Sequence, residues 1–319
     1  MTAEIDTVLD RRRLRRRLTV WRTLAVAAVV AALFAFGISG ENLSTFGTKQ
    51  IARVSIQGTI TEDREQLELL KRIADSDSAA ALLVFVNSPG GTTTGGEALF
   101  AALREVSKKK PVVAQFGTVA ASAGYIVGLG ADHIVTRANT ITGSVGVLIQ
   151  WPEVSQALDK LGVKFNEIKS GDLKAVPSPF EPLSEEGQKV TQTMIDEGFQ
   201  WFLGLVEQRR GIKAAQIPGL TRGRVFTGRE AVQLKLADSI GGEDQAVEWL
   251  RTDRKIDKSL KVVDWKPQSS ASLGFFSSIG SAAASFFNHT YVGQMLARDP
   301  NLAGLGLDGL ISVWHPSEN

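Results

Sequence analysis

The sequence Ala79-Ala-Ala-Leu-Leu-Val-Phe-Val86 runs directly into Asn87-Ser-Pro-Gly-Gly91. A continuous apolar run of this length is typical of a strand that is covered on both faces, as strands of parallel sheets are. Glycines at the end of such a strand let backbone N–H groups approach a ligand closely, although Ser-Pro-Gly-Gly is also a good turn. The stretch therefore predicts a buried strand that ends in a candidate binding loop.

Predicted strands and helices alternate before and after this strand along the sequence. From the hydrophobic pattern we expect strands at 51–56, 112–116 and 133–136, and helices at 62–74, 97–109 and 122–129. Alternation in units of roughly thirty residues indicates an α/β fold with parallel strand pairing. A longer helix should begin at Ser184, which can cap its first turn, and end at Gly211.

The formal net charge of +2 hides an uneven distribution. Seven of the 36 Lys and Arg residues precede residue 23, against three of the 34 Asp and Glu residues. The rest of the chain carries 29 basic and 31 acidic side chains, which does not support a nucleic-acid-binding surface. The chain has no cysteine, and this excludes disulfides and thiol catalysis.

An uncharged, mostly apolar segment of 18 residues, 23–40, follows the arginine-rich start. As a helix it would be about 27 Å long, close to the hydrocarbon thickness of a bilayer. We expect a transmembrane anchor rather than a buried helix of a soluble protein, because the uniformly apolar segment lies directly behind six arginines. The anchor should stay uncleaved, because Gly37-Ile-Ser39 is a possible but poor signal-peptide cleavage site. Positive residues stay in the cytoplasm, so the N-terminus should lie inside and residues from about 41 outside.

These features divide the chain into five segments. They are a basic cytoplasmic segment (1–22), the anchor (23–40), a polar tether (41–49), the main folded domain (50–265) and a C-terminal appendage (266–319). The appendage is rich in Ser, Ala, Gly and Phe and is too broken to be a second transmembrane helix by pattern. We expect it to pack on the domain or to lie close to the membrane.

Ser122 and Lys174 are candidates for a catalytic pair. A serine alcohol needs a neighbouring base, and His133, His289 and His315 all lie in contexts that do not look built for this role. A lysine with a lowered pKa is the known substitute for histidine. Alone, a serine among Ala and Gly is more often a packing residue, and a loop lysine is more often solvated.

Two further segments bear on this chemistry. Ile141-Thr-Gly-Ser-Val-Gly-Val147 is either a glycine-punctuated strand or the segment whose Ser144 orients a neutral lysine amine. The backbone N–H groups of Gly90, Gly91 and Ala123 are candidates for an oxyanion hole. The reaction expected from these groups needs no metal ion and no cofactor.

Together, the motifs resemble those of the signal peptide peptidase A family of membrane-anchored Ser/Lys proteases. The matching motifs are Asn87–Gly91, Ala120–Tyr125, Thr142–Val147, Lys169–Lys174, Ser178–Phe180, Gly223–Ala231 and Leu236–Gly242. The last two also resemble segments of the ring-forming caseinolytic proteases. The resemblance covers about residues 50–250. It departs from the family at Ala123, where glycine is more usual, and at Asp172, whose charge would oppose deprotonation of a nearby lysine.

The resemblance implies a crotonase-like or caseinolytic-protease-like spiral of ββα units. It assigns Ser122 as nucleophile, Lys174 as general base, Ser144 as the lysine-orienting serine, and Gly90 and Gly91 as the oxyanion loop. It further implies peptide substrates left after signal-peptide cleavage, a place in the bacterial inner membrane with the catalytic domain in the periplasm, and a homo-oligomeric ring with shared active sites.

Two other functions stay open from the sequence. Acyl-CoA hydratases and isomerases share the fold and also use paired backbone N–H groups, so the fold alone does not determine the reaction. Those enzymes are normally soluble and lack a serine nucleophile and a lysine base at these positions. A membrane-anchored scaffold with an inactive protease site is the other alternative.

Overall fold

The computed structural model describes residues 21–24, 48–267 and 311–313. The chain forms two compact units, Met1–Lys49 and Gln50–Asn319. Most of the predicted anchor (23–40), of the segments around it and of the appendage (266–319) lies outside the described residues. Among the residues described, no helix is both long and apolar enough to cross a membrane.

A largely parallel sheet organises the second unit. Its main order is β6-β5-β3-β2-β1-β8, with β4 also on β3, β7 on β4 and β9 on β2. The strands are β1 Gln50–Ile60, β2 Ala79–Thr92, β3 Val112–Ala121, β4 His133–Thr136, β5 Ile141–Gly143, β6 Val225–Thr227, β7 Ser239–Ile240, β8 Val262–Asp264 and β9 Ile311–Val313. Only β5–β6 and β2–β9 pair antiparallel among these described strands. The predicted α/β fold with parallel pairing is confirmed.

Helices follow most of the strands. They are α2 Arg64–Asp75, α3 Thr93–Ser107, α4 Ala123–Leu129, α5 Ser155–Lys160, α6 Glu185–Arg210, α7 Gly228–Gln233 and α8 Glu243–Thr252, with 3₁₀ turns at Ala214–Gln216 and Leu220–Arg222. The predicted ends of α6 are confirmed: Ser184 Oγ accepts from Gly187 N, and Gly211 ends the helix in the left-handed conformation with φ 63°. This conformation suits glycine because it has no Cβ.

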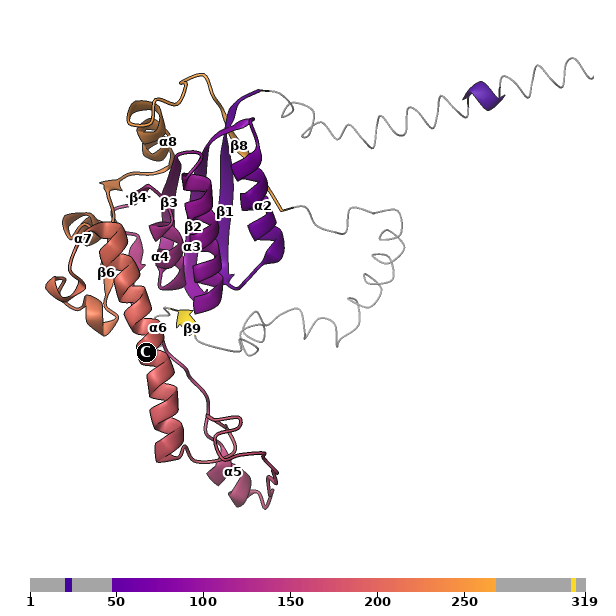
Figure 1. Ribbon diagram of the computed structural model, residues 1–319, viewed down its shortest axis with the longest axis vertical. Coiled ribbons are helices and arrows are strands. Elements are labelled where there is room, and N and C mark those ends of the chain that lie inside the picture. Colours follow the sequence, from indigo (N-terminus) through magenta and orange to yellow (C-terminus); the bar gives the residue numbers. More distant parts are fainter. Residues whose placement is uncertain (1–20, 25–47, 268–310, 314–319) are drawn as a thin grey trace, which may run out of the picture. The chain divides into compact units, whose positions relative to one another are not determined.

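The alternation of side chains along β2 builds a core on each face of the sheet. Leu82, Val84 and Val86 lie in the larger core with residues of α2, α3 and α4. Ala81 and Leu83 lie in a smaller core that α8 covers. Figure 1 shows α2 and α3 crossing one face of the sheet. The apolar run from 79 to 86 is thus buried on both sides, as predicted for a parallel strand.

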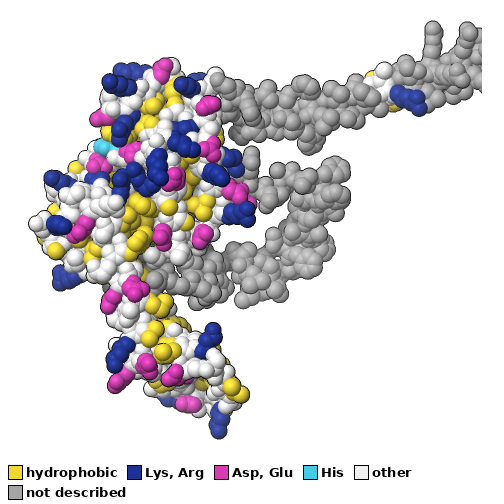
Figure 2. All heavy atoms as spheres, in the orientation of Figure 1, with side chains coloured by type: hydrophobic (Ala, Val, Ile, Leu, Met, Phe, Trp, Pro, Cys, Tyr) yellow, Lys and Arg dark blue, Asp and Glu magenta, His cyan; other side chains and the backbone are white. Residues whose placement is uncertain are grey.

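One part of the unit extends away from the sheet. We call it the arm: α5 with its N-cap Val154, the loop after it and the first half of α6, residues 154–198. Helix α5 has no buried residue, and Figure 1 shows it beside the end of α6 that is remote from α4. The second half of α6 instead buries Phe202, Leu205 and Val206 in the larger core. Hydrophobic side chains are visible on the surface of the arm in Figure 2.

Candidate active site

Ser122 lies at a sharp turn between β3 and α4. Its backbone has φ 57° and ψ −120°, a conformation that is costly for a residue with a Cβ. The surrounding backbone holds this turn: Ser122 N donates to Gly143 O at 2.9 Å, and Ser122 O accepts from Tyr125 N and Ile126 N. A serine on a strained strand-to-helix turn is the arrangement that presents the nucleophile in α/β hydrolases.

The predicted loop Asn87–Gly91 is the last part of strand β2, which continues to Thr92, so the prediction of a loop there was wrong. We keep the name glycine loop for these residues, which pack against the turn at Ser122. Ser88 pairs with Ala120 of β3, and a Cβ added to Gly124 would lie only 2.8 Å from Ser88 O. Gly91 has no room for a side chain either, because its Cβ would lie 1.9 Å from Ile60 O. Gly90 has φ 128°, and its N–H donates to Ser88 Oγ at 3.1 Å. Close contact with the backbone therefore explains Gly91 and Gly124, and the positive φ explains Gly90.

Ser144 follows β5 immediately. Parallel pairing of β3 with β5 sets Ala121 opposite Gly143, so Ser122 and Ser144 leave neighbouring strands at the same edge of the sheet. The backbone at Ser144 is also left-handed, with φ 51°, and its N–H donates to Arg224 O at 3.0 Å. The structure thus brings together the predicted nucleophile, the predicted orienting serine and the glycine loop.

Lys174 lies elsewhere, exposed on the arm. Its backbone N–H closes a turn onto Gly171 O at 3.1 Å. The arm is held by its own contacts: Val154 N donates to Pro179 O at 2.8 Å, and Phe165 stacks on Phe180 with centroids 4.2 Å apart. Within this single chain, the predicted base is therefore not placed beside Ser122.

Helix α6 accounts for this separation. Near its C-terminal end, Arg209 donates to Leu129 O and Ala131 O at 2.8 and 2.9 Å, which ties that end to α4. The helix has 26 residues and is therefore about 39 Å long at 1.5 Å per residue, so its first turn lies at that distance from the end that contacts α4. The loop that carries Lys174 joins the helix at this remote end (Figure 1).

Other titratable groups near these segments are engaged elsewhere. Lys169 pairs with Glu181 and, at 3.1 Å, with Glu167, and its hydrogen bond to Glu181 raises the pKa of the lysine. Tyr125 donates to Leu236 O at 2.8 Å, and burial raises the pKa of its hydroxyl. Both groups thus keep their protons more firmly than usual, which does not suit a base.

His133 is a structural residue. It stacks on Trp249 with ring centroids 4.6 Å apart, and its Nε2 lies 2.9 Å from Ser239 Oγ. It pairs beside Val113 near the start of β3, whereas Ser122 follows the end of that strand, so roughly 25 Å of strand at about 3.3 Å per residue separates them. His289 and His315 lie outside the described residues.

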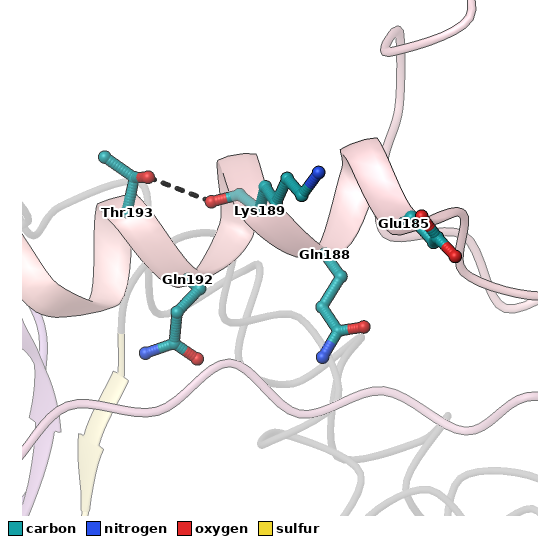
Figure 3. Close-up of a pocket in the computed structure, with 5 residues that line it drawn as sticks. All are labelled: Glu185, Gln188, Lys189, Gln192 and Thr193. Carbon is teal, nitrogen blue, oxygen red and sulfur yellow. Dashed lines mark hydrogen bonds between the residues drawn. The ribbon is translucent and has the colours of Figure 1, made fainter.

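Two surface hollows lie on the arm. The larger, about 630 Å³, is lined by residues between Phe165 and Glu186, among them Lys169 and Asp172. The other, about 550 Å³, is lined by Glu185, Gln188, Lys189, Gln192 and Thr193 along the polar side of α6 (Figure 3). There the Thr193 hydroxyl donates to Lys189 O at 2.9 Å, a bond from a side chain to the backbone one turn earlier in the same helix. Neither lining contains a paired nucleophile and base.

Comparison with known proteins identifies the family of this chain. The model of peptidase family S49 matches residues 104–257, and the Clp protease model matches residues 50–155. A relative from Synechocystis sp. that carries the name protease is 35% identical over 218 residues, covering 68% of this chain and 78% of the relative. The chain belongs to peptidase family S49. As an S49 member it is a serine protease with a Clp-protease-like α/β fold.

A second S49 relative carries the name signal peptide peptidase SppA, from Enterococcus faecium. It is 30% identical over 280 residues, which cover 83% of this chain and 77% of the relative. Among solved structures, a membrane-bound stomatin-specific protease, 1510-N, aligns with a TM-score of 0.46 and 16% identity over 70% of this chain and all of that one.

Proposed function

We propose that this S49 protease is a membrane-anchored endopeptidase in which Ser122 is the nucleophile and Lys174 the general base. The observation that carries the proposal is the strained turn at Ser122, with the glycine loop and Ser144 at the same sheet edge. Residues 23–40 would anchor it in the bacterial inner membrane with the catalytic domain in the periplasm. Cleaved signal peptides and other membrane-associated peptides would be its substrates.

The reaction would proceed through an acyl-enzyme. The neutral Lys174 amine accepts the hydroxyl proton as Ser122 Oγ attacks the peptide carbonyl carbon. Backbone N–H groups of Gly90, Gly91 and Ala123 stabilise the oxyanion, and Gly90 N–H would exchange its bond to Ser88 Oγ for this one. The tetrahedral intermediate then expels the amine product, which takes the proton from Lys174. Water attacks the ester in the same manner and releases Ser122.

The position of Lys174 favours a site shared between subunits. Ser122 is 1% exposed in the body, by which we mean the sheet and the helices packed on it. Lys174 is exposed on the arm, which leads away from the body. A head-to-tail ring would let each arm deliver its lysine to the Ser122 of the neighbouring subunit, since heterologous interfaces close by rotation. Burial in that interface would favour the neutral amine, which is the form that accepts a proton. Ser144 would then orient it.

Strand addition is the mode of substrate binding that we propose. Residues Gly90–Thr92 already pair with an antiparallel strand, because β9 lies along them with Gly90 opposite Val313. An extended peptide could use the same backbone groups, which gives affinity without demanding a particular sequence. It would also lie beside the turn that carries Ser122, as cleavage requires.

Mixing two inactive variants tests the shared site. Ser122→Ala and Lys174→Ala subunits are each expected to be inactive as pure assemblies. In an equal random mixture, about one interface in four pairs an intact Ser122 with an intact Lys174, because the interfaces of a closed ring are equivalent. Recovery of about a quarter of wild-type activity supports a shared site. No recovery, in mixed assemblies confirmed by mass, would place both residues in one subunit.

The alternative of an inactive scaffold is tested separately. A fluorophosphonate should modify wild-type protein at Ser122, with the Ser122→Ala variant as the matched control. Absence of labelling in folded, assembled wild-type protein would favour the scaffold over the protease. An acyl-CoA reaction is disfavoured by the S49 match, which spans the Ser122 segment and the Lys174 loop.

A further inference from the structure

Strand β3 contains a bulge just before Ser122. Strands β2 and β3 pair in continuous register as far as Val86 opposite Phe116, and pairing resumes with Ser88 opposite Ala120. Between these two pairs, β3 therefore contains two more residues than β2. Extra residues of this kind bend a strand and are frequent beside active sites, where they redirect a side chain.

The Asn87 side chain holds this bulge. Its Oδ1 accepts from Thr118 N at 3.0 Å and from Val119 N at 3.2 Å. These two N–H groups belong to the residues that the extra length displaces from the ladder, so one side-chain oxygen replaces the backbone acceptors they would otherwise use. The fit is close, because a Cβ on Gly117 would lie 2.9 Å from Asn87 Oδ1.

The bulge is also the point at which β3 changes its neighbour. Before it, β3 pairs with β4 as far as Phe116 opposite Thr136. After it, β3 pairs with β5, from Val119 opposite Ile141 to Ala121 opposite Gly143. This second pairing is the one that sets Ser122 beside Ser144. The extra residues of β3 thus lie where its partner changes from β4 to β5, immediately before Ser122.

We infer that Asn87 is a positioning residue: through its two bonds to the bulge it sets the place of Ser122 relative to Ser144 and the glycine loop. This inference rests on the proposed role of Ser122 as nucleophile. Asn87 stands in the loop motif, yet the sequence shows no chemical role for it, because its partners lie about thirty residues further along the chain. A second bond supports the same bulge, from Thr140 Oγ1 to Gly117 O at 2.6 Å.

The test compares Asn87→Ala with Asn87→Asp in the full-length protein. Aspartate keeps an oxygen that can accept from both N–H groups, whereas alanine removes it. The measurements are the rate of fluorophosphonate labelling at Ser122, and kcat and KM for a peptide substrate. A displacement of the nucleophile by about 1 Å can cost about 10²-fold in rate. We expect losses of this order in kcat and in labelling for Asn87→Ala, KM within about threefold, and rescue of most of the loss by Asn87→Asp.

Asn139→Ala is the matched control. Asn139 is exposed, and its Oδ1 accepts from Arg229 at 3.2 Å and not from the bulge; its loss should leave labelling and kcat unchanged. If Asn87→Ala fails to fold, Thr140→Val carries the test, with a smaller loss expected in the same two rates. Wild-type labelling and kcat in a folded Asn87→Ala variant, or in Thr140→Val, would overturn the inference. Failure of wild-type protein to label at Ser122 would instead overturn the proposed function.

Discussion

The turn at Ser122 and the arm that carries Lys174 are built in opposite ways. The turn is buried, and strands β2 and β5 and helix α4 hold it through backbone hydrogen bonds and contacts too close for a Cβ. The arm is exposed and bonded mainly to itself, with Leu161 76% exposed and Ile168 fully exposed. The single chain therefore fixes the position of the proposed nucleophile, whereas the proposed base lies on an exposed segment.

This contrast is informative about where rigidity is required. A nucleophile must be held within a fraction of an ångström, which suits a strained turn at the end of buried strands. A lysine on an exposed arm can be supplied to another molecule, and its exposed apolar neighbours give that contact something to bury.

Replacing Ser122 by alanine should abolish peptide cleavage without unfolding the protein. The change removes only the nucleophilic oxygen, and loss of such a group in related hydrolases costs around 10⁴–10⁶ in kcat. Steady-state kinetics together with circular dichroism test it. More than a few per cent of wild-type activity in the folded variant would move the nucleophile to another residue.

Lys174→Arg should reduce kcat/KM by about 10²–10⁴-fold, the usual contribution of a general base. Arginine keeps the positive charge but does not lose its proton in proteins, so it cannot accept one from Ser122. Steady-state kinetics on the variant and the wild-type enzyme measure the loss. Wild-type kcat/KM in a folded Lys174→Arg variant would show that the arm does not supply the base.

The two halves of α6 allow the contrast to be measured within one helix. Phe202 is fully buried in the body, and its replacement by alanine should lower the free energy of unfolding by about 3–5 kcal/mol. Met194 is 47% exposed on the arm, and its replacement by alanine should change the free energy of unfolding by no more than about 0.5 kcal/mol. Urea unfolding measures both. A similar large loss for Met194→Ala would mean that a neighbouring subunit covers the arm in solution.

Ser144→Ala should leave a partly active enzyme. The orienting hydroxyl is lost but the base remains, so we expect a loss of about 3–10-fold, the equivalent of about one hydrogen bond. The alkaline limb of the pH–rate profile should shift as well. If Ser144 is only a residue of the turn after β5, both the rate and the profile will match those of the wild type.

The smallest expected effect concerns stability in the body of the protein. Burial against Trp249 lowers the pKa of His133 below its usual value of about 6.5, although Asp238 opposes this shift. The unfolded chain therefore binds a proton more readily, and stability should be lost as the pH falls from about 6.5 through the lower pKa of the folded state. His133→Phe should make urea midpoints less dependent on pH in this window. An unchanged dependence would contradict this account.

Several features followed from local sequence alone. The apolar run from 79 to 86 predicted a strand buried on both faces, and the ends of α6 at Ser184 and Gly211 were predicted correctly. Other ends were shifted: β1 continues to Ile60, four residues beyond the predicted end, and α3 begins at Thr93 rather than at residue 97. Periodicity and caps depend on residues a few positions apart, and this explains why they were readable from the sequence.

Only the tertiary structure determined which segments of the candidate site lie side by side. The pairing of β3 with β5, the bonds from Asn87 to the bulge and the remoteness of Lys174 depend on hydrogen bonds and helix lengths between segments twenty or more residues apart. The motifs indicate Ser122, Ser144 and Lys174 as candidate site residues, but they do not predict which of these residues lie close together within one chain. The register of β3 and β5 places the two serines side by side. The lysine is separated from Ser122 by the 26-residue length of α6, because each residue of a helix adds about 1.5 Å along its axis.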